Sequence, residues 1–493
     1  MVVFAGLAFL ASMDARATRD PAAETLLRAK ELMQTGRYQE AASIYTELVR
    51  LHPRDPGLKA NLGMAQHLAG QHENAVRQLE PVLMLQPKNA PVMLMLGSSY
   101  LQLGNPRKAV ALLQKAISLA SDVEEGHQLL AEALVQDGRY QDAARKFERW
   151  SSLDDRDPRA WYGLGRCYDA LARAEFELLL REAPESGYAL ALVARSQQLK
   201  SQYRSAFHLY REALKRGPTI RGLHLALGEI YAATGHNDWA VQERAKEQAL
   251  GVPQCDQRPR ECAFHLAKFR EAAAPVSEPS LEATYWRTRA LSELARQSFQ
   301  RVVELGNSVE SHGVQATMER ERGRTAESIA EWKAALALSP NNLVLQKELA
   351  ITLRLHEDYQ GAREIVERLL AVNPDSAELN YLMGQIVSNQ QQPELAIPFL
   401  EKVVRAEPEF LPARSSLGLA LLRVERETDA IPHLRAALSL DADGSLNFRL
   451  ARAYQKLGLT EAANQAFARY KELQTRVDAQ PANSERESQI TRP

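Results

Sequence analysis

The sequence predicts an all-α protein, built as a solenoid of repeated helix pairs. Three observations lead to this prediction. Small residues recur along most of the chain at a period of 34 residues. Alanine and leucine are abundant whereas runs of β-branched residues are rare, which favours helix over sheet. Prolines recur where the second helix of each pair should end. At 493 residues the chain is also far longer than one ordinary domain.

The period is visible in two ladders of small residues, each interrupted in the middle of the chain. The first ladder runs through Ala29, Gly63, Gly97, Ala131 and Gly165, and resumes through Ala316, Ala350, Gly384, Gly418 and Ala451. The second runs through Ala41, Ala75, Ala109 and Ala143, and resumes through Ser328, Ala362, Ala396, Ala430 and Ala463. Two ladders with one period indicate a true structural repeat.

Each repeat has the pattern of two amphipathic helices joined by a turn. Large, small and aromatic residues share one helical face around Gly97. Turns are expected at Gly36 and Gly138. Small residues at the crossing allow two helix backbones to approach closely. Proline closes the second helix because it lacks the amide proton that continuation requires, at Pro53, Pro87, Pro218, Pro340, Pro374 and Pro408.

These residues resemble the tetratricopeptide repeat family, whose pattern is W-x2-L-G-x2-Y, then A-x3-F, then P. The first part is matched by Trp161, Leu164, Gly165 and Tyr168; other units match in part, as at Leu96, Gly97, Tyr100, Ala109 and Leu113. The resemblance covers roughly residues 22–473. It implies a right-handed superhelix whose concave wall, lined by the first helix of each pair, grips peptides or partner subunits.

Two repeats depart from the pattern. After Tyr168 the second-helix residues Ala172 and Phe176 arrive five positions early, so the inter-helix turn is missing. The same signature returns around Phe299. We therefore expect single long helices over 159–182 and 285–305, which cannot fold back on themselves and should kink or re-aim the solenoid.

These features divide the chain into five segments. In order, we expect a signal peptide (1–17), a regular N-terminal array (22–157), an irregular middle (158–308), a regular C-terminal array (309–473) and a polar, disordered tail (478–493).

The first segment bears on the cellular compartment. Residues 2–11 form an apolar run of signal-peptide length, followed by small residues at Ala15 and Ala17, but no basic residue precedes the run. An uncleaved membrane anchor and a segment without a role remain alternatives. If the protein is exported to an oxidising compartment, Cys255 and Cys262 are expected to form a local disulfide. The alternative is two unpaired thiols.

The sequence carries no signature of catalysis or of cofactor binding. Nucleotide-binding glycine loops and the common hydrolase and metalloprotease motifs do not occur. Histidines such as His67 and His72 are expected at turns or on exposed helix faces. The 61 basic and 62 acidic residues create no global field for nucleic acid. We therefore expect no enzyme, no cofactor, no metal, no small-molecule substrate and no nucleic-acid partner, and membrane contact only through an uncleaved N-terminal segment.

Candidate binding residues follow from the groove positions that the family resemblance implies. The last unit and the one before it offer a basic strip, made of Arg423, Arg449, Arg452 and Lys456, with apolar support from Tyr381 and Phe448. The middle offers Tyr162, Arg166 and Arg195 at corresponding positions. The alternative for the strip is a solvated end cap, which terminal repeats need.

The sequence thus predicts an interaction scaffold for protein or peptide partners. The leading hypothesis places it in a secreted or periplasmic assembly. The first alternative is a cytoplasmic adaptor or co-chaperone-like module with the same groove, and a more remote one is an accessory subunit of an enzyme.

Overall fold

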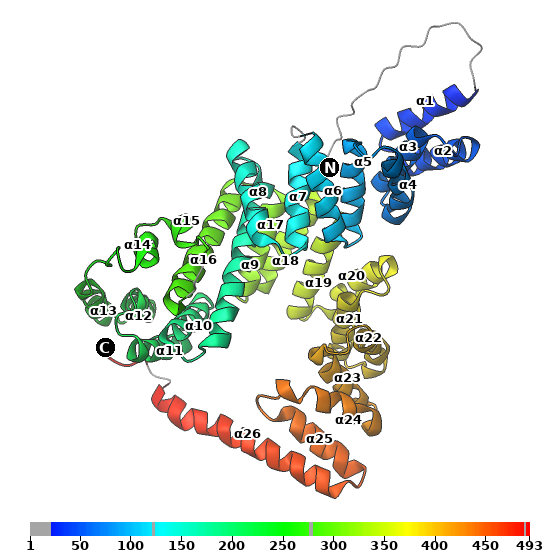
Figure 1. Cartoon of the computed structure of the whole chain (residues 1–493). Coiled ribbons are helices and arrows are strands. Elements are labelled where there is room, and N and C mark those ends of the chain that lie inside the picture. The colour runs from blue at the N-terminus through cyan, green and yellow to red at the C-terminus, as the bar shows by residue number, and fades with distance from the viewer. Residues whose placement is uncertain (1–20, 121–123, 276–279, 488–489) are drawn as a thin grey trace. The chain divides into compact units, whose positions relative to one another are not determined.

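The computed structural model describes residues 21–120, 124–275, 280–487 and 490–493, and every regular element within these ranges is helical (Figure 1). The chain forms two compact units, Met1–Asp155 and Arg156–Pro493. The boundary between them lies close to the one expected after residue 157. The expected signal peptide at 1–17 lies outside the described residues.

The first unit consists of consecutive helix pairs. They are α1 (Pro21–Gln34) with α2 (Tyr38–Leu51), α3 (Pro56–Leu68) with α4 (His72–Leu85), α5 (Ala90–Gln102) with α6 (Pro106–Leu119), and α7 (Glu124–Gln136) with α8 (Tyr140–Leu153). The expected turns are present, because Gly36 and Gly138 adopt φ angles of 75° and 74°, which residues with a side chain rarely adopt. Asp55 caps α3 by accepting hydrogen bonds from the backbone N–H groups of Gly57 and Leu58.

The ladder residues lie where the helices of a pair cross. Ala41, Ala75 and Ala109 are fully buried. A β-carbon added to Gly63 would lie 2.6 Å from the side chain of Leu79 on the partner helix. Small residues are therefore required at this crossing, because the helix backbones are too close for a larger side chain.

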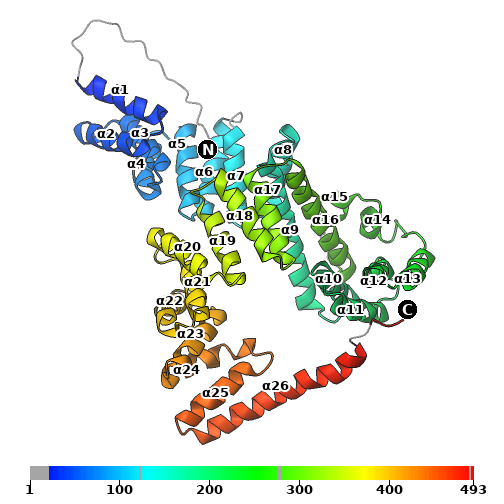
Figure 2. The same cartoon turned by 180° about the vertical axis from the view of Figure 1, so that it is seen from behind.

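The second unit begins with the irregular middle. Its helices are α9 (Pro158–Glu182), α10 (Gly187–Leu199), α11 (Tyr203–Arg216), α12 (Leu223–Ala233), α13 (Asn237–Ala249), α14 (Pro259–His265), α15 (Phe269–Ala272) and α16 (Leu281–Glu304). The two long helices expected at 159–182 and 285–305 are confirmed as α9 and α16. They pack against each other along their length, as Figures 1 and 2 show.

The two long helices together complete two repeats, because each half of α9 pairs with a half of α16. We call this pairing the exchange of helix halves. Gly165, in the first half of α9, faces Phe299 in the second half of α16. Leu179, in the second half of α9, shares a core with Tyr285 and Trp286 in the first half of α16. Each half of a long helix therefore packs against a half of the other long helix. In an ordinary repeat the packing partner is instead the next helix, which follows after a short turn.

The helices between α9 and α16 form a side array, which we call the branch (α10–α15). The branch contains the pairs α10 with α11, α12 with α13, and α14 with α15. At its start α10 contacts both α9 and α16, and at its end α14 and α15 contact α16. The branch therefore leaves the two long helices and returns to them.

The C-terminal array follows α16 directly. It comprises α17 (Val309–Glu321), α18 (Thr325–Leu338), α19 (Leu343–Leu355), α20 (Tyr359–Val372), α21 (Ala377–Asn389), α22 (Pro393–Ala406), α23 (Leu411–Arg423), α24 (Glu427–Ala436), the short 3-10 helix η1 (Leu438–Leu440), α25 (Ser445–Lys456) and α26 (Thr460–Glu487). Because α17 packs on both α9 and α16, the boundary expected at residue 308 does not separate two compact units.

Part of the segment 478–493, for which the sequence predicts a disordered tail, is helical in the structure. Helix α26 continues to Glu487, and residues 490–493 lie against the branch. The segment from 478 to 487 contains good helix formers such as Ala, Gln, Glu and Arg, but also Pro481, Asn483 and Ser484, which disfavour a helix interior. The expectation rested on the polar character of this segment and on its Pro and Ser content, and the disorder of the tail stays a prediction.

Candidate binding surfaces

The predicted groove residues of the middle segment lie on the long helices and on the branch. Tyr162 and Arg166 are on the first half of α9, where the guanidinium of Arg166 lies 5.7 Å from the centre of the Tyr162 ring. The Tyr162 ring is also 6.2 Å from that of Phe299, and burial raises the pKa of the Tyr162 hydroxyl. Tyr162 therefore joins the exchanged helix halves, and Arg166 is the exposed member of the pair.

Arg195 faces the inside of the branch. Burial lowers the pKa of its guanidinium, and the neighbouring charge of Arg289 on α16 lowers it further. Arg289 donates a hydrogen bond from Nη1 to the hydroxyl of Tyr285 at 3.0 Å, and its guanidinium lies 4.8 Å from the centre of the Phe264 ring. Its Nε is buried and has no hydrogen-bond partner among the described residues. Sequence reasoning missed Arg289, because the repeat pattern does not tell which helix faces α10.

The inner wall of the branch is largely filled by aromatic rings. Phe264 lies 5.1 Å from Trp286, and Tyr188 lies 5.2 Å from Tyr285, measured between ring centres. Together with Arg289 these side chains join α10 and α14 of the branch to α16.

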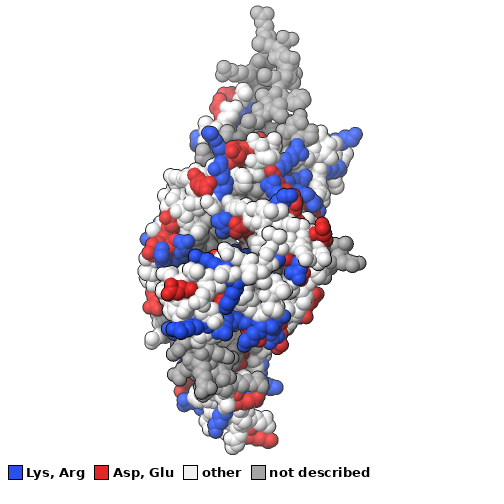
Figure 3. Space-filling view, turned by 90° about the vertical axis from the view of Figure 1, so that its left-hand side faces the viewer, with Lys and Arg blue, Asp and Glu red and all other residues white. Residues whose placement is uncertain are grey.

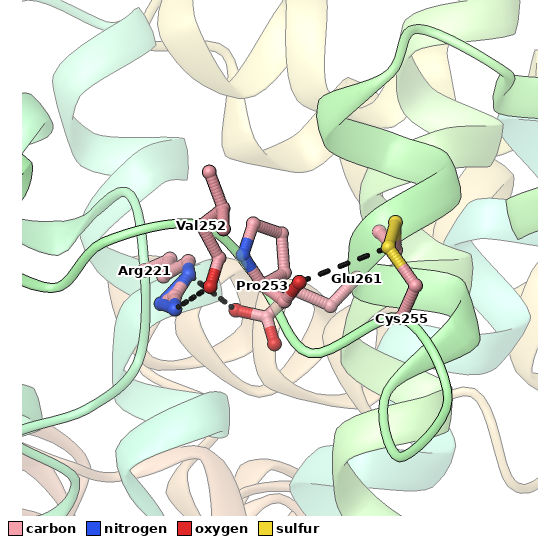
Figure 4. The surroundings of a disulfide bond; sticks show 6 residues. Arg221, Val252, Pro253, Cys255 and Glu261 are labelled. Carbon is pink, nitrogen blue, oxygen red and sulfur yellow. Dashed lines mark hydrogen bonds and ion pairs between the residues drawn. A yellow bond between two sulfur atoms is a disulfide. The ribbon is translucent and has the colours of Figure 1, made fainter.

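The loop that carries Cys255 connects α13 to α14 in the branch. Cys255 and Cys262 form a disulfide, and Cys262 is buried. Arg221 donates hydrogen bonds to the carbonyl oxygens of Leu250 and Val252. It also lies 3.6 Å from the carboxylate of Glu261, and Figure 4 shows Arg221 with Val252 and Glu261. The disulfide thus holds the start of α14 next to a buried ion pair that joins it to the preceding repeat.

The first helices of the C-terminal array are linked by polar contacts, which we call the first-helix ladder. Arg320 on α17 pairs with Glu348 on α19 at 2.7 Å, and Lys347 on α19 pairs with Glu378 on α21 at 2.8 Å. Arg423 on α23 donates a hydrogen bond to the carbonyl oxygen of Ser388 on α21. Two basic and two acidic side chains of these first helices are therefore compensated within the chain, whereas Arg423 is held only by a backbone carbonyl among the described residues.

The residues of the basic strip expected at the end of the array differ in whether their charges are paired. Lys456 pairs with the buried carboxylate of Glu427 at 2.6 Å, so its charge is already compensated. Arg449 and Arg452 are exposed, and neither has an ion-pair partner among the described residues. Two of the expected basic residues thus remain available.

The two aromatic residues expected to support the strip make contacts within the chain. The ring of Phe448 lies 5.2 Å from Tyr470 and 6.0 Å from Phe467, both on α26. Tyr381 lies 5.0 Å from Phe410 in the next repeat. Phe448 therefore packs the last helix pair together, whereas Tyr381 stiffens a junction between repeats.

Among the residues that the structure describes, neither a metal-binding cluster nor an activated free thiol is present. No group of three His, Cys, Asp or Glu side chains among them is placed to hold a metal ion. Burial raises the pKa of the Cys167 thiol to about 12, which leaves it unreactive at neutral pH. None of the described helices is both long and apolar enough to cross a membrane. Figure 3 shows basic and acidic side chains interspersed on one face, with Lys and Arg gathered in a band across its middle.

Comparison with known families agrees with this geometry. Three family models, each described as the tetratricopeptide repeat, match residues 66–133 and 319–386, residues 26–90 and 129–189, and residues 377–410. The chain belongs to the tetratricopeptide-repeat family.

Several curated proteins are similar to parts of this tetratricopeptide-repeat chain. Anaphase-promoting complex subunit 7 of Arabidopsis thaliana is 22% identical over 261 residues, covering 49% of this chain and 47% of that protein. The peroxisomal targeting signal receptor of Candida albicans is 26% identical over 27% of this chain and 23% of that protein. BBSome complex member BBS4 of Bos taurus is 24% identical over 46% of this chain and 51% of that protein. The chain thus spans about half of two of these relatives and about a quarter of the other.

Solved structures in the comparison include tetratricopeptide-repeat proteins. MamA MSR-1 is 25% identical, covers 34% of this chain and 98% of that chain, and superposes with a TM-score of 0.31. YrrB, described as a TPR protein with an unusual peptide-binding site, is 18% identical, covers 36% of this chain and 92% of that chain, and has a TM-score of 0.32.

The surroundings predicted from the sequence for one histidine were wrong. His67, expected at a turn or on an exposed face, is half-buried on α3 with Nδ1 2.9 Å from the hydroxyl of Ser99 on α5. Burial and the nearby His72 lower the pKa of His67 to about 4. The repeat pattern marks only apolar and small positions, so it gives no signal for a polar contact between successive first helices.

Proposed function

We propose that the chain is a non-enzymatic scaffold that binds an extended, acidic segment of a partner polypeptide at the end of its C-terminal array. The observation that carries this proposal is the exposure of Arg449 and Arg452, without ion-pair partners among the described residues, on the first helix of the last pair. Three residues apart, they lie on the same face of α25. On the first helices α17, α19 and α21, Arg320 is paired with Glu348 and Lys347 with Glu378 within the chain.

The family and its relatives support the general class of function. The names of the similar proteins identify one subunit of the anaphase-promoting complex, one member of the BBSome complex and one receptor of a targeting signal. By that similarity, we infer a polypeptide partner for this chain as well. Each exposed ion pair contributes about 0–1 kcal/mol, so binding also needs apolar or backbone contacts beyond the two arginines.

We further propose that the protein works in a secreted or periplasmic assembly. The apolar run at residues 2–11 and the disulfide between Cys255 and Cys262 support this compartment. The alternative is a cytoplasmic adaptor with the same surface. Sequencing the N-terminus of the mature protein separates them, because cleavage after Ala17 leaves Thr18 first, whereas an unprocessed N-terminus overturns the signal-peptide proposal.

The binding proposal is tested by charge reversal with a matched control. Partners captured by the wild-type chain from its native cells are identified by mass spectrometry, and capture of the same partner is then compared between variants. The double variant Arg449→Glu/Arg452→Glu should lose capture. The control Lys402→Glu/Arg405→Glu reverses two exposed basic residues at the same spacing on α22, a second helix, and should capture as the wild type does.

Two measurements complete this test. Both variants should keep the wild-type thermal unfolding curve by circular dichroism, which shows that the fold is intact. Capture by the wild type should weaken as salt is raised, because exposed charges are screened. Equal capture by the two double variants would show that the partner binds elsewhere and would refute the proposed site.

A further inference from the structure

The last four residues of the chain lie on the branch, away from the helix pair that precedes them. Figures 1 and 2 both show the C-terminus beside α11 and α13. The hydroxyl of Tyr231 on α12 donates a hydrogen bond to the carbonyl oxygen of Thr491 at 2.5 Å. Arg211 on α11 donates from Nη1 to the Thr491 hydroxyl at 2.7 Å.

The neighbours of Thr491 also contact the branch. Ile490 packs against the apolar core that α10, α11 and α12 share. The guanidinium of Arg492 lies 5.9 Å from the centre of the Trp239 ring on α13. Three consecutive residues thus make an apolar contact, two hydrogen bonds and a cation–π contact, which is how a short extended peptide is recognised.

The surface beneath this segment is a pocket between two successive turns of the branch. It is lined by the turn from α10 to α11 and by the turn from α12 to α13, through Ser201, Gln202, Tyr203, Arg204, Ser205, Thr234 and His236, together with Ile490 itself. Its volume is about 820 Å³, more than the isoleucine side chain fills.

Aromatic packing fixes the groups that contact the segment. Tyr231 stands edge to face with Phe207 at 5.5 Å and with Trp239 at 5.5 Å, measured between ring centres. His236 lies 4.3 Å from Trp239. Since these rings hold one another, the Tyr231 hydroxyl and the Trp239 face are in place before any ligand arrives, which lowers the entropic cost of binding.

We propose that this edge of the branch is a peptide-binding site whose resident ligand is the chain's own C-terminal segment, Ile490–Pro493. The site is independent of the arginines on α25 and lies on a different array. Its ligand chemistry is an apolar residue followed by a hydroxyl residue and a cation in extended conformation.

Tethering determines how the site behaves toward other ligands. Because the tail is attached to the same chain, its effective concentration at the site is on the order of millimolar when the connection can span the distance. A free peptide must compete with that concentration. The site is therefore masked in the wild-type chain and becomes accessible when the tail is altered or displaced.

The test uses the full-length chain and a fluorescein-labelled peptide with the sequence of residues 486–493. The tail is disabled in the full chain by Ile490→Asp/Arg492→Glu, which places charges where apolar and cation–π contacts are made. Fluorescence anisotropy should show that the disabled chain binds the peptide about tenfold or more tightly than the wild type, because the resident competitor is removed. A peptide carrying the same two substitutions should not bind.

A matched pair of site variants locates the binding. In the disabled chain, Arg211→Glu removes the donor to Thr491 and should weaken binding of the peptide about tenfold. Lys215→Glu makes the same charge change one turn along α11, where the side chain pairs with Glu212 and not with the tail, and should bind as its parent does. Equal effects of the two substitutions, or peptide binding no tighter to the disabled chain than to the wild type, would overturn the proposal.

Light scattering tests that the ligand comes from the same chain. The wild type and the disabled chain should have the same mass. A wild type that is twice the mass of the disabled chain would assign the bound tail to a second copy and overturn the intrachain assignment.

Discussion

The ring of Phe299 on α16 fills the space directly above Gly165 on α9, where an added β-carbon would lie 2.6 Å from the ring. In an ordinary repeat of this chain the same glycine faces a leucine of its own helix pair, as Gly97 faces Leu113. The contact between Gly165 and Phe299 therefore shows that the first half of α9, which is a first helix of the repeat pattern, packs against the second half of α16 as its second helix. The whole branch (α10–α15) lies between these two segments in the sequence.

The first prediction concerns this contact. Gly165→Ala should destabilise the second unit by about 1–3 kcal/mol, because the ring must move to admit the methyl group. Combined with Phe299→Leu, which shortens the opposing side chain, its cost should fall by about 1 kcal/mol relative to the sum of the single changes. The free energy of unfolding is measured by urea titration with circular dichroism.

A glycine in another repeat serves as the control. A β-carbon on Gly384 would meet Leu400 of its own pair at 2.7 Å, so Gly384→Ala should also destabilise. Its effect should simply add to that of Phe299→Leu, since the residues share no contact. Additive behaviour of Gly165→Ala with Phe299→Leu would contradict the exchange of helix halves.

Much of this architecture was predictable because it is written in local patterns. The small residues that recur every 34 positions predicted the helix pairs. The missing turn after Tyr168 predicted the long helix α9. The recurrence of the second-helix signature at Phe176 and Phe299 indicated two such helices. Their exchange was not predicted, because a repeat pattern specifies what a helix packs against but not which copy supplies it.

The candidate sites were predicted less well, for a related reason. The expected positions of Lys456 and Phe448 were derived one helix at a time, whereas both side chains are engaged by neighbouring helices. The contacts of Thr491 and Arg492 join segments that no periodicity relates. Polar contacts between distant segments leave no spacing in the sequence from which to read them.

The second prediction concerns the disulfide. Replacing Cys255 and Cys262 with serine should lower the stability of α14 and α15 by about 2–3 kcal/mol in the chain-entropy model, because the unfolded loop regains its freedom. Hydrogen exchange should therefore accelerate over residues 259–272. Protection of α19–α23 should be unchanged, since contacts in a repeat array are between neighbours.

Thiol counting tests the same bond without substitution. Denatured, unreduced native protein should expose one reactive thiol, that of Cys167, the free cysteine of the structure. Three reactive thiols would show that the disulfide is absent from the native protein.

The third prediction concerns the pH dependence of the first unit. Burial, together with His72, holds the pKa of His67 at about 4, compared with 6.5 in an unfolded chain. Below pH 6.5 the unfolded state binds a proton that the folded state does not, so stability is lost as the pH falls from 6.5 towards 4. The full loss amounts to about 3 kcal/mol.

The variant His67→Gln isolates this contribution. Glutamine does not titrate but retains groups that can hydrogen-bond to Ser99. Between pH 7 and pH 4.5 the urea midpoint of the first unit should fall less in His67→Gln than in the wild type. Identical slopes in the two proteins would show that His67 does not control the loss.

The last prediction separates structure from binding in the basic strip. Lys456 donates a hydrogen bond to the buried carboxylate of Glu427, and this contact lowers the pKa of that carboxyl. Lys456→Glu would leave Glu427 facing a like charge, so the C-terminal array should melt at a lower temperature. Arg452→Glu changes an exposed side chain, so its melting temperature should stay close to that of the wild type while partner capture falls. Thermal melting by circular dichroism and capture of the same partner are measured for both variants. If Lys456→Glu melts at the wild-type temperature and yet loses partner capture, Lys456 is a binding residue. Its ion pair with Glu427 then does not stabilise the fold.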